Sequence, residues 1–271
     1  IASDKTGTLT MNQMTVEKMV YDNEIHDASE EISKDNIALR VMNLANDTKI
    51  SQDNSLLGDP TETAMVQYGL DKNYDVREEL VNIPRIAEVP FDSTRKLMTT
   101  IHQLEDGKYL VATKGAPDML LDRVTKVEKH GEVSAFTEDD RTTLMKLNKE
   151  MATQALRVLA MAYKVIDTLP DTVDTDSIEH DLIFAGLVGM IDPERKEAAA
   201  AIKVAQSAGI RTIMITGDHR DTAQAIAKRL GILRPDQEDG VLTGGELNDI
   251  SDEELERTVE TRSEEHTSEL Q

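Results

Sequence analysis

The sequence predicts an α/β fold in which both ends of the chain build a parallel sheet and the middle forms an inserted α+β domain with an antiparallel sheet. Three observations predict it. A short strand-like opening ends at Asp4, and alternating strand and helix patterns follow Leu182. Several strand-like runs lie between them without that alternation. Alternating strands and helices are typical of a parallel sheet with helices on both faces.

The expected domains follow from this division. Residues 1–13 and 186–261 would form the parallel-sheet domain, which would be incomplete, and residues 14–185 would form the inserted domain. Residues 262–271 have no periodic apolar face and resemble a translated sequencing adapter, so we expect a non-native tail. The chain opens at Ile1 without an initiator Met, and we therefore expect a piece of a longer protein.

The opening and the inserted domain contain local signals. Ile1–Ser3 would close a strand, and a helix should begin at Pro60 with Asp59 as its N-cap. A second helix should open at Thr137, and Asp167–Asp181 reads as a solvated loop. The apolar side chains on one face of the second helix would be Leu144, Leu147, Met151 and Leu156. The antiparallel strands are expected at Leu97–His102, Tyr109–Thr113 and Val158–Ile166.

The last third of the chain predicts a strand–helix–strand–helix unit of the parallel sheet. The expected elements are a strand at Leu182–Gly189, a helix at Lys196–Ala208, a strand at Arg211–Ile215 and a helix at Arg220–Leu230. Gly209 and Gly231 would end the two helices. In parallel sheets the chemistry lies beyond the carboxyl ends of the strands, which here are followed by Asp4 and by Thr216–Asp218.

Composition excludes several classes of function. With 30 Lys and Arg against 52 Asp and Glu, the net charge of −22 disfavours binding to nucleic acid or anionic membranes. The absence of cysteine excludes disulfides, thiolate metal sites and cysteine nucleophiles. The longest apolar run, Leu182–Ile191, is far shorter than the roughly 20 residues that a bilayer span needs. We therefore expect no direct contact with a membrane.

The stretch DKTGTLT at Asp4–Thr10 carries the strongest chemical signal. A carboxylate at the end of a strand can attack phosphorus and form an aspartyl-phosphate. A turn rich in glycine and threonine supplies N–H groups and hydroxyls that cradle a phosphoryl group, and Lys5 adds positive charge. A strand that merely ends in aspartate is the structural alternative, which the complete seven-residue stretch makes weak.

This stretch resembles the phosphorylation motif of P-type ATPases, the cation pumps that pass through a phosphoaspartate. Three further motifs occur in the order typical of that family: KGAP at Lys114–Pro117, DPER at Asp192–Arg195 and TGD at Thr216–Asp218. The resemblance covers residues 1–261 and is closest to the bacterial calcium-transporting branch. It implies a haloacid dehalogenase-like (Rossmann-like) phosphorylation domain and an inserted nucleotide-binding domain.

The resemblance also implies roles for residues of the phosphorylation domain. Asp4 would be the nucleophile, and Mg²⁺ would bind the Asp4 carboxylate and the Thr6 carbonyl. Thr216 and Gly217 would donate to the phosphoryl group, with Asp218 on the same turn. Related phosphatases often carry a second aspartate at the position of Thr6, and its absence should slow hydrolysis of the phosphoenzyme.

In the inserted domain the resemblance implies an ATP site. The adenine would stack on Phe91 and bind Glu62, while Lys96, Lys114 and Arg157 would approach the base and phosphates. Gly115 would give close backbone access, and the segment with Asp192 and Arg195 would form the return crossing, near the nucleotide. Structural alternatives stay open: Phe91 in the core, Glu62 as a helix-dipole acid, and Arg157 and Arg195 as surface cations. Ser93 replaces an arginine found in some members, so Arg95 and other cations compete for the β-phosphate role.

The implied activity is ATP hydrolysis coupled to cation transport, with calcium as the ion suggested by resemblance alone. ATP is the substrate, Mg²⁺ the cofactor, and the actuator and transmembrane domains of the same polypeptide are the partners. The full protein would lie in the bacterial plasma membrane with this part on its cytoplasmic face, and the isolated chain would be soluble. We expect the isolated chain to bind ATP weakly and to phosphorylate poorly. A soluble phosphatase of the same fold and a non-catalytic nucleotide-binding module are the alternatives.

Overall fold

The computed structural model describes residues 1–217, 220–237, 240–249, 251 and 264–266. The chain divides into two compact units. We call residues 14–151 and 157–190 the antiparallel unit, and residues 1–13, 152–156 and 191–271 the parallel unit. The sequence predicted the second boundary after residue 185, which lies inside the strand β12 (Leu182–Ile191). The structure divides the chain after Met190, near the end of that strand.

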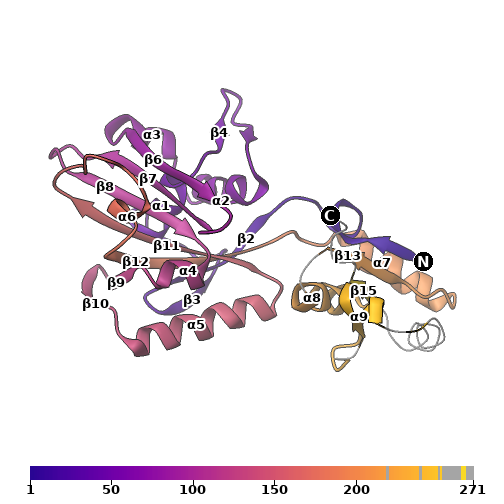
Figure 1. Ribbon diagram of the computed structural model, residues 1–271. Coiled ribbons are helices and arrows are strands. Elements are labelled where there is room, and N and C mark those ends of the chain that lie inside the picture. The colour runs from indigo at the N-terminus through magenta and orange to yellow at the C-terminus, as the bar shows by residue number, and fades with distance from the viewer. Residues whose placement is uncertain (218–219, 238–239, 250, 252–263, 267–271) are drawn as a thin grey trace. The chain divides into compact units, whose positions relative to one another are not determined.

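A large twisted sheet forms the framework of the antiparallel unit (Figure 1). Its strands lie in the order β10-β9-β12-β11-β8-β7-β6, and β2 pairs with β12 and β3. These strands are β2 (Thr15–Tyr21), β3 (Glu24–Asp27), β6 (Arg85–Asp92), β7 (Leu97–Gln103), β8 (Tyr109–Gly115), β9 (Val124–Lys129), β10 (Glu132–Ala135), β11 (Arg157–Ile166) and β12 (Leu182–Ile191). A separate hairpin pairs β4 (Lys49–Ile50) with β5 (Leu56–Leu57). The predicted antiparallel sheet is confirmed.

Six helices are described in this unit: α1 (Ile37–Leu44), α2 (Pro60–Asp71), α3 (Val76–Asn82), α4 (Pro117–Leu121), α5 (Glu138–Thr153, whose last two residues belong to the other unit) and α6 (Thr175–Ile178). The predicted start of α2 is confirmed, because the Asp59 side chain accepts from the Thr61 amide and Pro60 is the first helical residue. The face predicted for α5 is right for Leu144 and Met151, which are buried. It is wrong for Leu156, which lies beyond the end of the helix.

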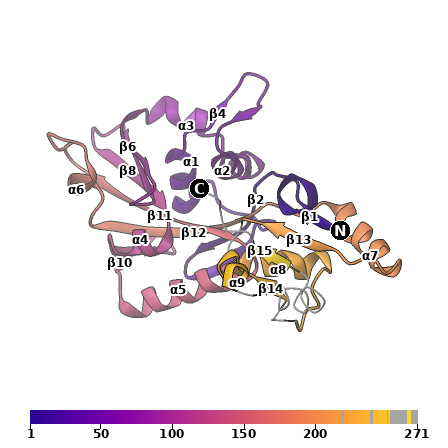
Figure 2. The ribbon, with the colours of Figure 1, turned by 45° about the vertical axis from the view of Figure 1, so that its right-hand side comes forward.

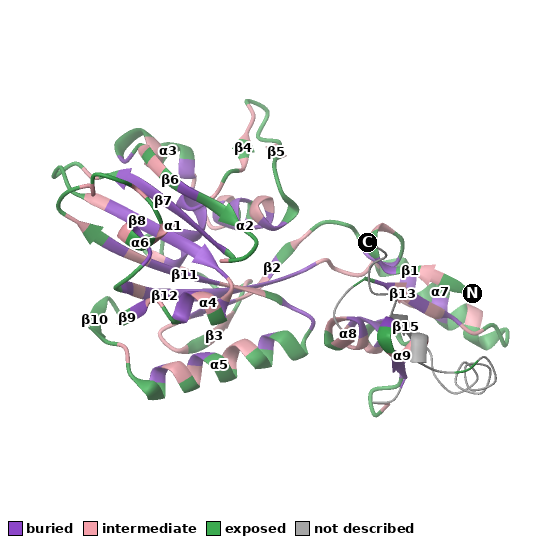
Figure 3. Ribbon diagram, in the orientation of Figure 1, coloured by how far each residue is buried: buried purple, intermediate pink, exposed green. Residues whose placement is uncertain are grey.

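The core lies on both faces of the sheet (Figure 3). Helices α1 and α2 lie side by side and pack against each other (Figure 2). Helix α1 also packs against β8 and β11, and α2 packs against β2. Leu110 and Ala112 belong to this main cluster, whereas Val111 packs with Ile101 and Ile178 in a second cluster. Successive residues of a strand point to opposite faces. The second cluster therefore shows that α6 covers the face opposite α1.

Two sequence predictions were wrong in this region. The strand predicted at Leu182–Gly189 belongs to the antiparallel sheet, where β12 lies between β9 and β11, and not to the parallel sheet. A continuous apolar run indicates a strand with two covered faces but not the sheet to which it belongs. The loop Asp167–Asp181 is not wholly solvated, because it contains α6 and buries Glu179.

A four-stranded sheet organises the parallel unit, with the order β1-β13-β15-β14. Its strands are β1 (Ala2–Asp4), β13 (Ile213–Thr216), β14 (Val241–Leu242) and β15 (Glu264–His266), and its helices are α7 (Lys196–Ser207), α8 (Arg220–Leu230) and α9 (Gly244–Asp249). Each strand pair is parallel. The origin of the predicted non-native tail stays a prediction, although the structure pairs Glu264–His266 of that segment with β13 and β14.

The start of the chain and its last third both contribute strands to this sheet. Ala2, Ser3 and Asp4 pair with Ile213, Met214 and Ile215 of β13. Gly209 and Gly231 follow α7 and α8 with left-handed φ angles of 74° and 75°, as expected of helix-ending glycines. No helix in the described part of the chain is both long and apolar enough to cross a membrane.

Candidate functional site

Asp4 lies at the carboxyl end of β1, next to the carboxyl end of β13. The register pairs Asp4 with Ile215, so Thr216 and Gly217 follow at the same edge of the sheet. The Asp4 residue is exposed, whereas Thr216 is buried. This edge is where open parallel sheets bind their ligands. The structure thus brings Asp4 together with Thr216 and Gly217, while Asp218 lies outside the described residues.

The turn Lys5–Leu9, which we call the Asp4 turn, follows β1 and contacts both β1 and β13. Gly7 has a φ of 76°, a left-handed conformation that glycine adopts without strain. The Thr10 amide donates to the Lys5 carbonyl at 3.0 Å and closes the turn. Lys5 is buried, whereas Thr6 is exposed. The positive charge predicted for this turn is therefore held inside the unit.

Asp192 and Arg195 fasten the Asp4 turn. The Thr10 hydroxyl donates to Asp192 Oδ2 at 2.6 Å, and the Gln13 amide donates to Asp192 Oδ1 at 3.1 Å. The Arg195 guanidinium donates to the Gly7 carbonyl at 2.9 Å. Hydrogen bonds to charged groups are among the stronger ones in proteins. The sequence placed these two residues near the nucleotide, and the structure shows them bonded to the turn that follows Asp4.

The donor set at this edge fits a magnesium ion that also binds phosphate. The Asp4 carboxylate and the Thr6 carbonyl, which belong to two exposed residues, would supply hard oxygen ligands. Among the residues that the structure describes, no group of three His, Cys, Asp or Glu side chains could hold a metal. Mg²⁺ usually binds one or two carboxylates and completes its shell with water and phosphate oxygens. The donors among these described residues therefore suit an ion that also binds substrate phosphate better than an ion held by protein ligands alone.

In the antiparallel unit, Glu62, Lys114 and Arg157 meet at the N-terminus of α2. The buried Lys114 ammonium pairs with Glu62 Oε1, and Glu62 Oε2 accepts from the Asp47 amide at 2.9 Å. Arg157 donates to the Thr61 hydroxyl at 2.9 Å. Burial lowers the pKa of Lys114, and the Glu62 charge opposes that shift. Glu62 thus lies in the first helical turn and pairs with a buried cation as well.

Phe91 and Lys96 flank the turn between β6 and β7. Phe91 is 62% exposed, so the core alternative for this ring is wrong. Lys96 is also exposed and has a left-handed φ of 54°. The Lys96 carbonyl accepts from the Ala116 amide at 3.1 Å, which joins this turn to the end of β8. The structure therefore connects the segment carrying Phe91 and Lys96 to the KGAP motif.

Gly115 is required by strand packing. A Cβ atom at this position would lie 2.2 Å from the Lys96 carbonyl oxygen and 2.9 Å from Leu97 Cα. Both neighbours are backbone atoms that cannot easily move away. The sequence assigned Gly115 to close approach of the backbone to a nucleotide. The structure gives it a further reason, namely the close approach of two strands of the sheet.

Sequence reasoning missed one buried polar group beside this site. Arg95, considered above for the β-phosphate, instead binds both carboxylate oxygens of Glu179, at 2.8 and 3.1 Å. The two residues are 84 positions apart, and Glu179 sits in an acidic, non-periodic segment. Its one local signal is Asp174–Ser177, where the two side chains cap α6 in a reciprocal capping box. That signal predicts a short helix but not a buried carboxylate.

Comparisons with known proteins agree with these motifs. The family model for the P-type ATPase cytoplasmic domain N matches residues 36–197. Calcium-transporting ATPase 1 of Bacillus cereus is 45% identical over 260 residues, which cover 94% of this chain and 28% of the relative. Calcium-transporting ATPase 1 of Lactococcus lactis is 43% identical over 96% of this chain and 29% of its own length. Human potassium-transporting ATPase alpha chain 2 is 33% identical over 96% of this chain and 30% of its own length.

The chain thus spans under a third of the length of these curated relatives. The family model alone covers more than half of the chain, including most of the antiparallel unit. Both the motifs recognised in the sequence and the mixed α/β fold with its antiparallel sheet are consistent with that match. The chain belongs to the P-type ATPase family.

Proposed function

We propose that this chain binds ATP and accepts its γ-phosphate on Asp4 within an ATP-driven cation pump. The observation that carries this proposal is the register of β1 and β13, which sets an exposed carboxylate beside Thr216 and Gly217. The parallel unit would be the haloacid dehalogenase-like phosphorylation domain, and the antiparallel unit would be the nucleotide-binding domain. An actuator domain and transmembrane helices of the same polypeptide would be the partners.

In the proposed reaction an Asp4 carboxylate oxygen attacks the γ-phosphorus of ATP. One O–P bond forms, the bond between the γ-phosphorus and the bridging oxygen breaks, and ADP leaves with that oxygen. Thr216 and Gly217 would donate to the transferred group. Mg²⁺, held by Asp4 and the Thr6 carbonyl, would neutralise the charge of the phosphate oxygens. The fastened Asp4 turn keeps the nucleophile in place, which matters because phosphoryl transfer depends on positioning.

Thr6 favours a pump over a soluble phosphatase. A carboxylic acid two residues after the nucleophile would assist hydrolysis, and general acid–base help contributes about 10²–10⁴-fold. Threonine cannot supply that help at neutral pH. A phosphoenzyme that survives long enough to be coupled to a conformational change is what a pump requires.

The antiparallel unit would hold the nucleotide. The exposed Phe91 ring can stack on adenine, while Lys96, Lys114 and Arg157 supply positive charge for the base and phosphates. Glu62 would accept from the adenine amino group and already neutralises Lys114. Arg95 is committed to Glu179, so Lys96 is the stronger candidate for the β-phosphate.

Calcium is the ion we propose, because the relatives from Bacillus cereus and Lactococcus lactis are named calcium-transporting ATPases. The pump would lie in the plasma membrane with this chain on its cytoplasmic face.

The proposal is tested in two steps. ATP should bind the isolated chain, and Phe91→Ala should weaken that binding about tenfold, since stacking on an aromatic ring contributes about 1–3 kcal/mol per base. For phosphoryl transfer, residues 1–261 would replace the matching segment of the Bacillus cereus relative. With radiolabelled ATP and Mg²⁺ the chimera should give an acid-stable, hydroxylamine-sensitive band, and Asp4→Asn should abolish it. A band that survives in Asp4→Asn would refute the proposed nucleophile.

A further inference from the structure

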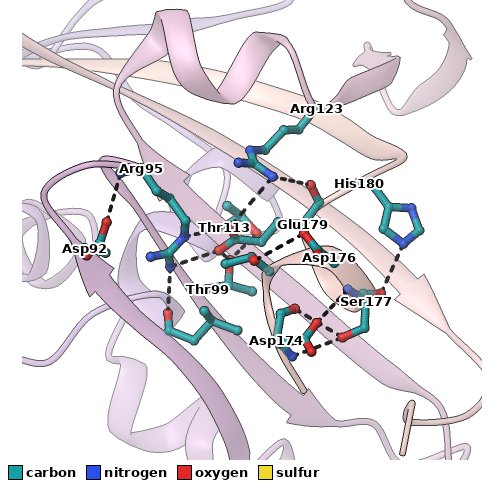
Figure 4. A network of polar contacts seen from close by, with 12 residues as sticks. Asp92, Arg95, Thr99, Thr113, Arg123, Asp174, Asp176, Ser177, Glu179 and His180 are labelled. Atoms are coloured by element: carbon teal, nitrogen blue, oxygen red, sulfur yellow. Dashed lines mark hydrogen bonds and ion pairs between the residues drawn. The ribbon is translucent and has the colours of Figure 1, made fainter. Parts of the chain in front are cut away.

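Glu179 is a carboxylate with no exposed side-chain surface. Arg95 binds it through two nitrogens, at 2.8 and 3.1 Å, and the Thr99 hydroxyl donates to Oε1 at 2.7 Å (Figure 4). Arg123 lies 4.0 Å from Oε2 and donates to the Glu179 carbonyl at 3.1 Å. A buried carboxylate is costly unless it is paired and hydrogen-bonded in this way. The position of the Arg95 guanidinium is therefore fixed.

Arg95 extends this network to the backbone before Phe91. Arg95 Nη2 donates to the Pro90 carbonyl at 2.8 Å and to the Val89 carbonyl at 3.3 Å. The Asp92 side chain accepts from the amides of Thr94 and Arg95, both at 3.0 Å, which tightens the same turn. The guanidinium thus holds the two carbonyls that immediately precede the Phe91 ring.

These carbonyls lack the support that a strand normally has. β6 is the last strand of the sheet, and its register with β7 is interrupted between Val89 and Asp92. Pro90 has no N–H to donate, and Phe91 is 62% exposed. An exposed ring on an interrupted edge strand would sample several orientations without another anchor. Arg95, held by Glu179, supplies that anchor.

We propose that Arg95 and Glu179 are positioning residues for the adenine-stacking face of Phe91. This inference rests on the proposed nucleotide-binding function of the antiparallel unit. Glu179 itself would not contact the nucleotide. Glu179 fixes Arg95, Arg95 holds the carbonyls of Val89 and Pro90, and these residues in turn orient the Phe91 ring.

The test is a double-mutant cycle on ATP affinity with the full chain. Phe91→Ala should raise the Kd for ATP about tenfold, because it removes the stacking ring. Glu179→Gln should raise it about fivefold, because the neutral amide loosens Arg95. The double variant should again bind about tenfold more weakly than the wild type, and not about fiftyfold, because Glu179 acts only through Phe91. Inorganic tripolyphosphate, which has no base, should bind all of these variants equally.

Two further variants separate positioning from stability. Arg95→Lys keeps the charge but loses the paired contacts, and it decides the question if Glu179→Gln does not fold. Glu79→Gln is the matched control, because it breaks the Arg40–Glu79 ion pair of the same unit without touching residues 89–96. Glu79→Gln should lower stability and leave the Kd for ATP unchanged, whereas Arg95→Lys should raise that Kd about fivefold.

The outcomes separate this inference from the proposed function. If Phe91→Ala leaves the Kd for ATP unchanged, the proposed adenine site is wrong and the inference falls with it. If Phe91→Ala weakens binding but Glu179→Gln and Arg95→Lys do not, the inference alone is wrong. The same holds if the effects of Phe91→Ala and Glu179→Gln multiply, because Glu179 would then act independently of the ring.

Discussion

The parallel and antiparallel units hold their candidate site residues by different means. In the parallel unit, strand register places Asp4. The turn behind it is fastened by hydrogen bonds: the Thr10 hydroxyl donates to the Asp192 carboxylate, and the Arg195 guanidinium donates to the Gly7 carbonyl. In the antiparallel unit, buried ion pairs fix the site, with Lys114 on Glu62 and Arg95 on Glu179. The first arrangement leaves the proposed nucleophile, Asp4, exposed, whereas the second fixes the side chains of Lys114 and Arg95 by ion pairs within the protein.

This difference predicts different sensitivities. Removing one partner of a buried ion pair leaves an unpaired charge in the protein interior and lowers the free energy of unfolding strongly. A turn fastened by several hydrogen bonds should lose less stability when one hydroxyl is removed. All five tyrosines of the chain lie in the antiparallel unit, so tyrosine fluorescence reports the unfolding of that unit.

The largest effect is expected for Glu62→Gln. The substitution leaves the buried Lys114 ammonium without its carboxylate, and breaking such a pair costs about 3 kcal/mol. Urea unfolding followed by tyrosine fluorescence would measure the loss. The double variant Glu62→Gln with Lys114→Met should recover much of it, because no unpaired charge remains. A single variant as stable as the wild type would show that the pair does not anchor this site.

A somewhat smaller effect is expected from pH, through His102. This ring is fully buried, and burial lowers its pKa to about 4 from an ordinary value of 6.5. The unfolded chain therefore takes up a proton below about pH 6.5 that the folded chain refuses until about pH 4, so stability is lost as the pH falls through that window. Between pH 7 and pH 5 this loss amounts to about 2 kcal/mol.

His102→Gln isolates this contribution. Its tyrosine-monitored unfolding free energy should fall less between pH 7 and pH 5 than that of the wild type, by about 2 kcal/mol. Equal slopes for the two proteins would contradict the burial of a neutral imidazole, which contacts the Ile83 carbonyl at 3.2 Å and the Thr100 hydroxyl at 2.9 Å.

The smallest effect is expected in the parallel unit, for Thr10→Val. Valine has a similar shape but loses the hydroxyl that donates to Asp192 and accepts from the Gly7 amide at 3.3 Å. The loss should be about 1 kcal/mol, and the Gly7 amide should exchange its hydrogen several-fold faster. Thr10→Ser keeps the hydroxyl and should retain the slow exchange. Unchanged exchange in Thr10→Val would mean that this hydroxyl does not hold the turn.

Local sequence patterns predicted the features that depend on residues close together in the chain, such as helix starts and helix ends. The Asp59 cap with Pro60 fixed the start of α2, and Gly209 and Gly231 marked two helix ends. The edge shared by Asp4 and Thr216 followed from two short strands, because parallel strands present the same ends together.

Contacts between residues far apart in the chain could not be predicted from the sequence. The apolar run of β12 would look the same in either sheet, and only its partners β9 and β11 decide the matter. Glu179 looked like one more acid of a solvated loop, because its partner Arg95 is distant in the chain. Asp192 and Arg195 were recognised by motif, yet their bonds to Thr10 and Gly7 come from a contact between segments more than 180 positions apart.

The central claim is that Asp4 accepts phosphate from ATP, and chemical mapping of the phosphorylated residue tests it most directly. The chimera carrying residues 1–261 would be incubated with ATP and Mg²⁺, quenched in acid and reduced with borohydride, which converts an aspartyl-phosphate to homoserine. Peptide mass spectrometry should find homoserine at position 4, and none when ATP is omitted. Homoserine at another aspartate, or aspartate left intact at position 4 in a protein that still incorporates phosphate, would contradict the claim.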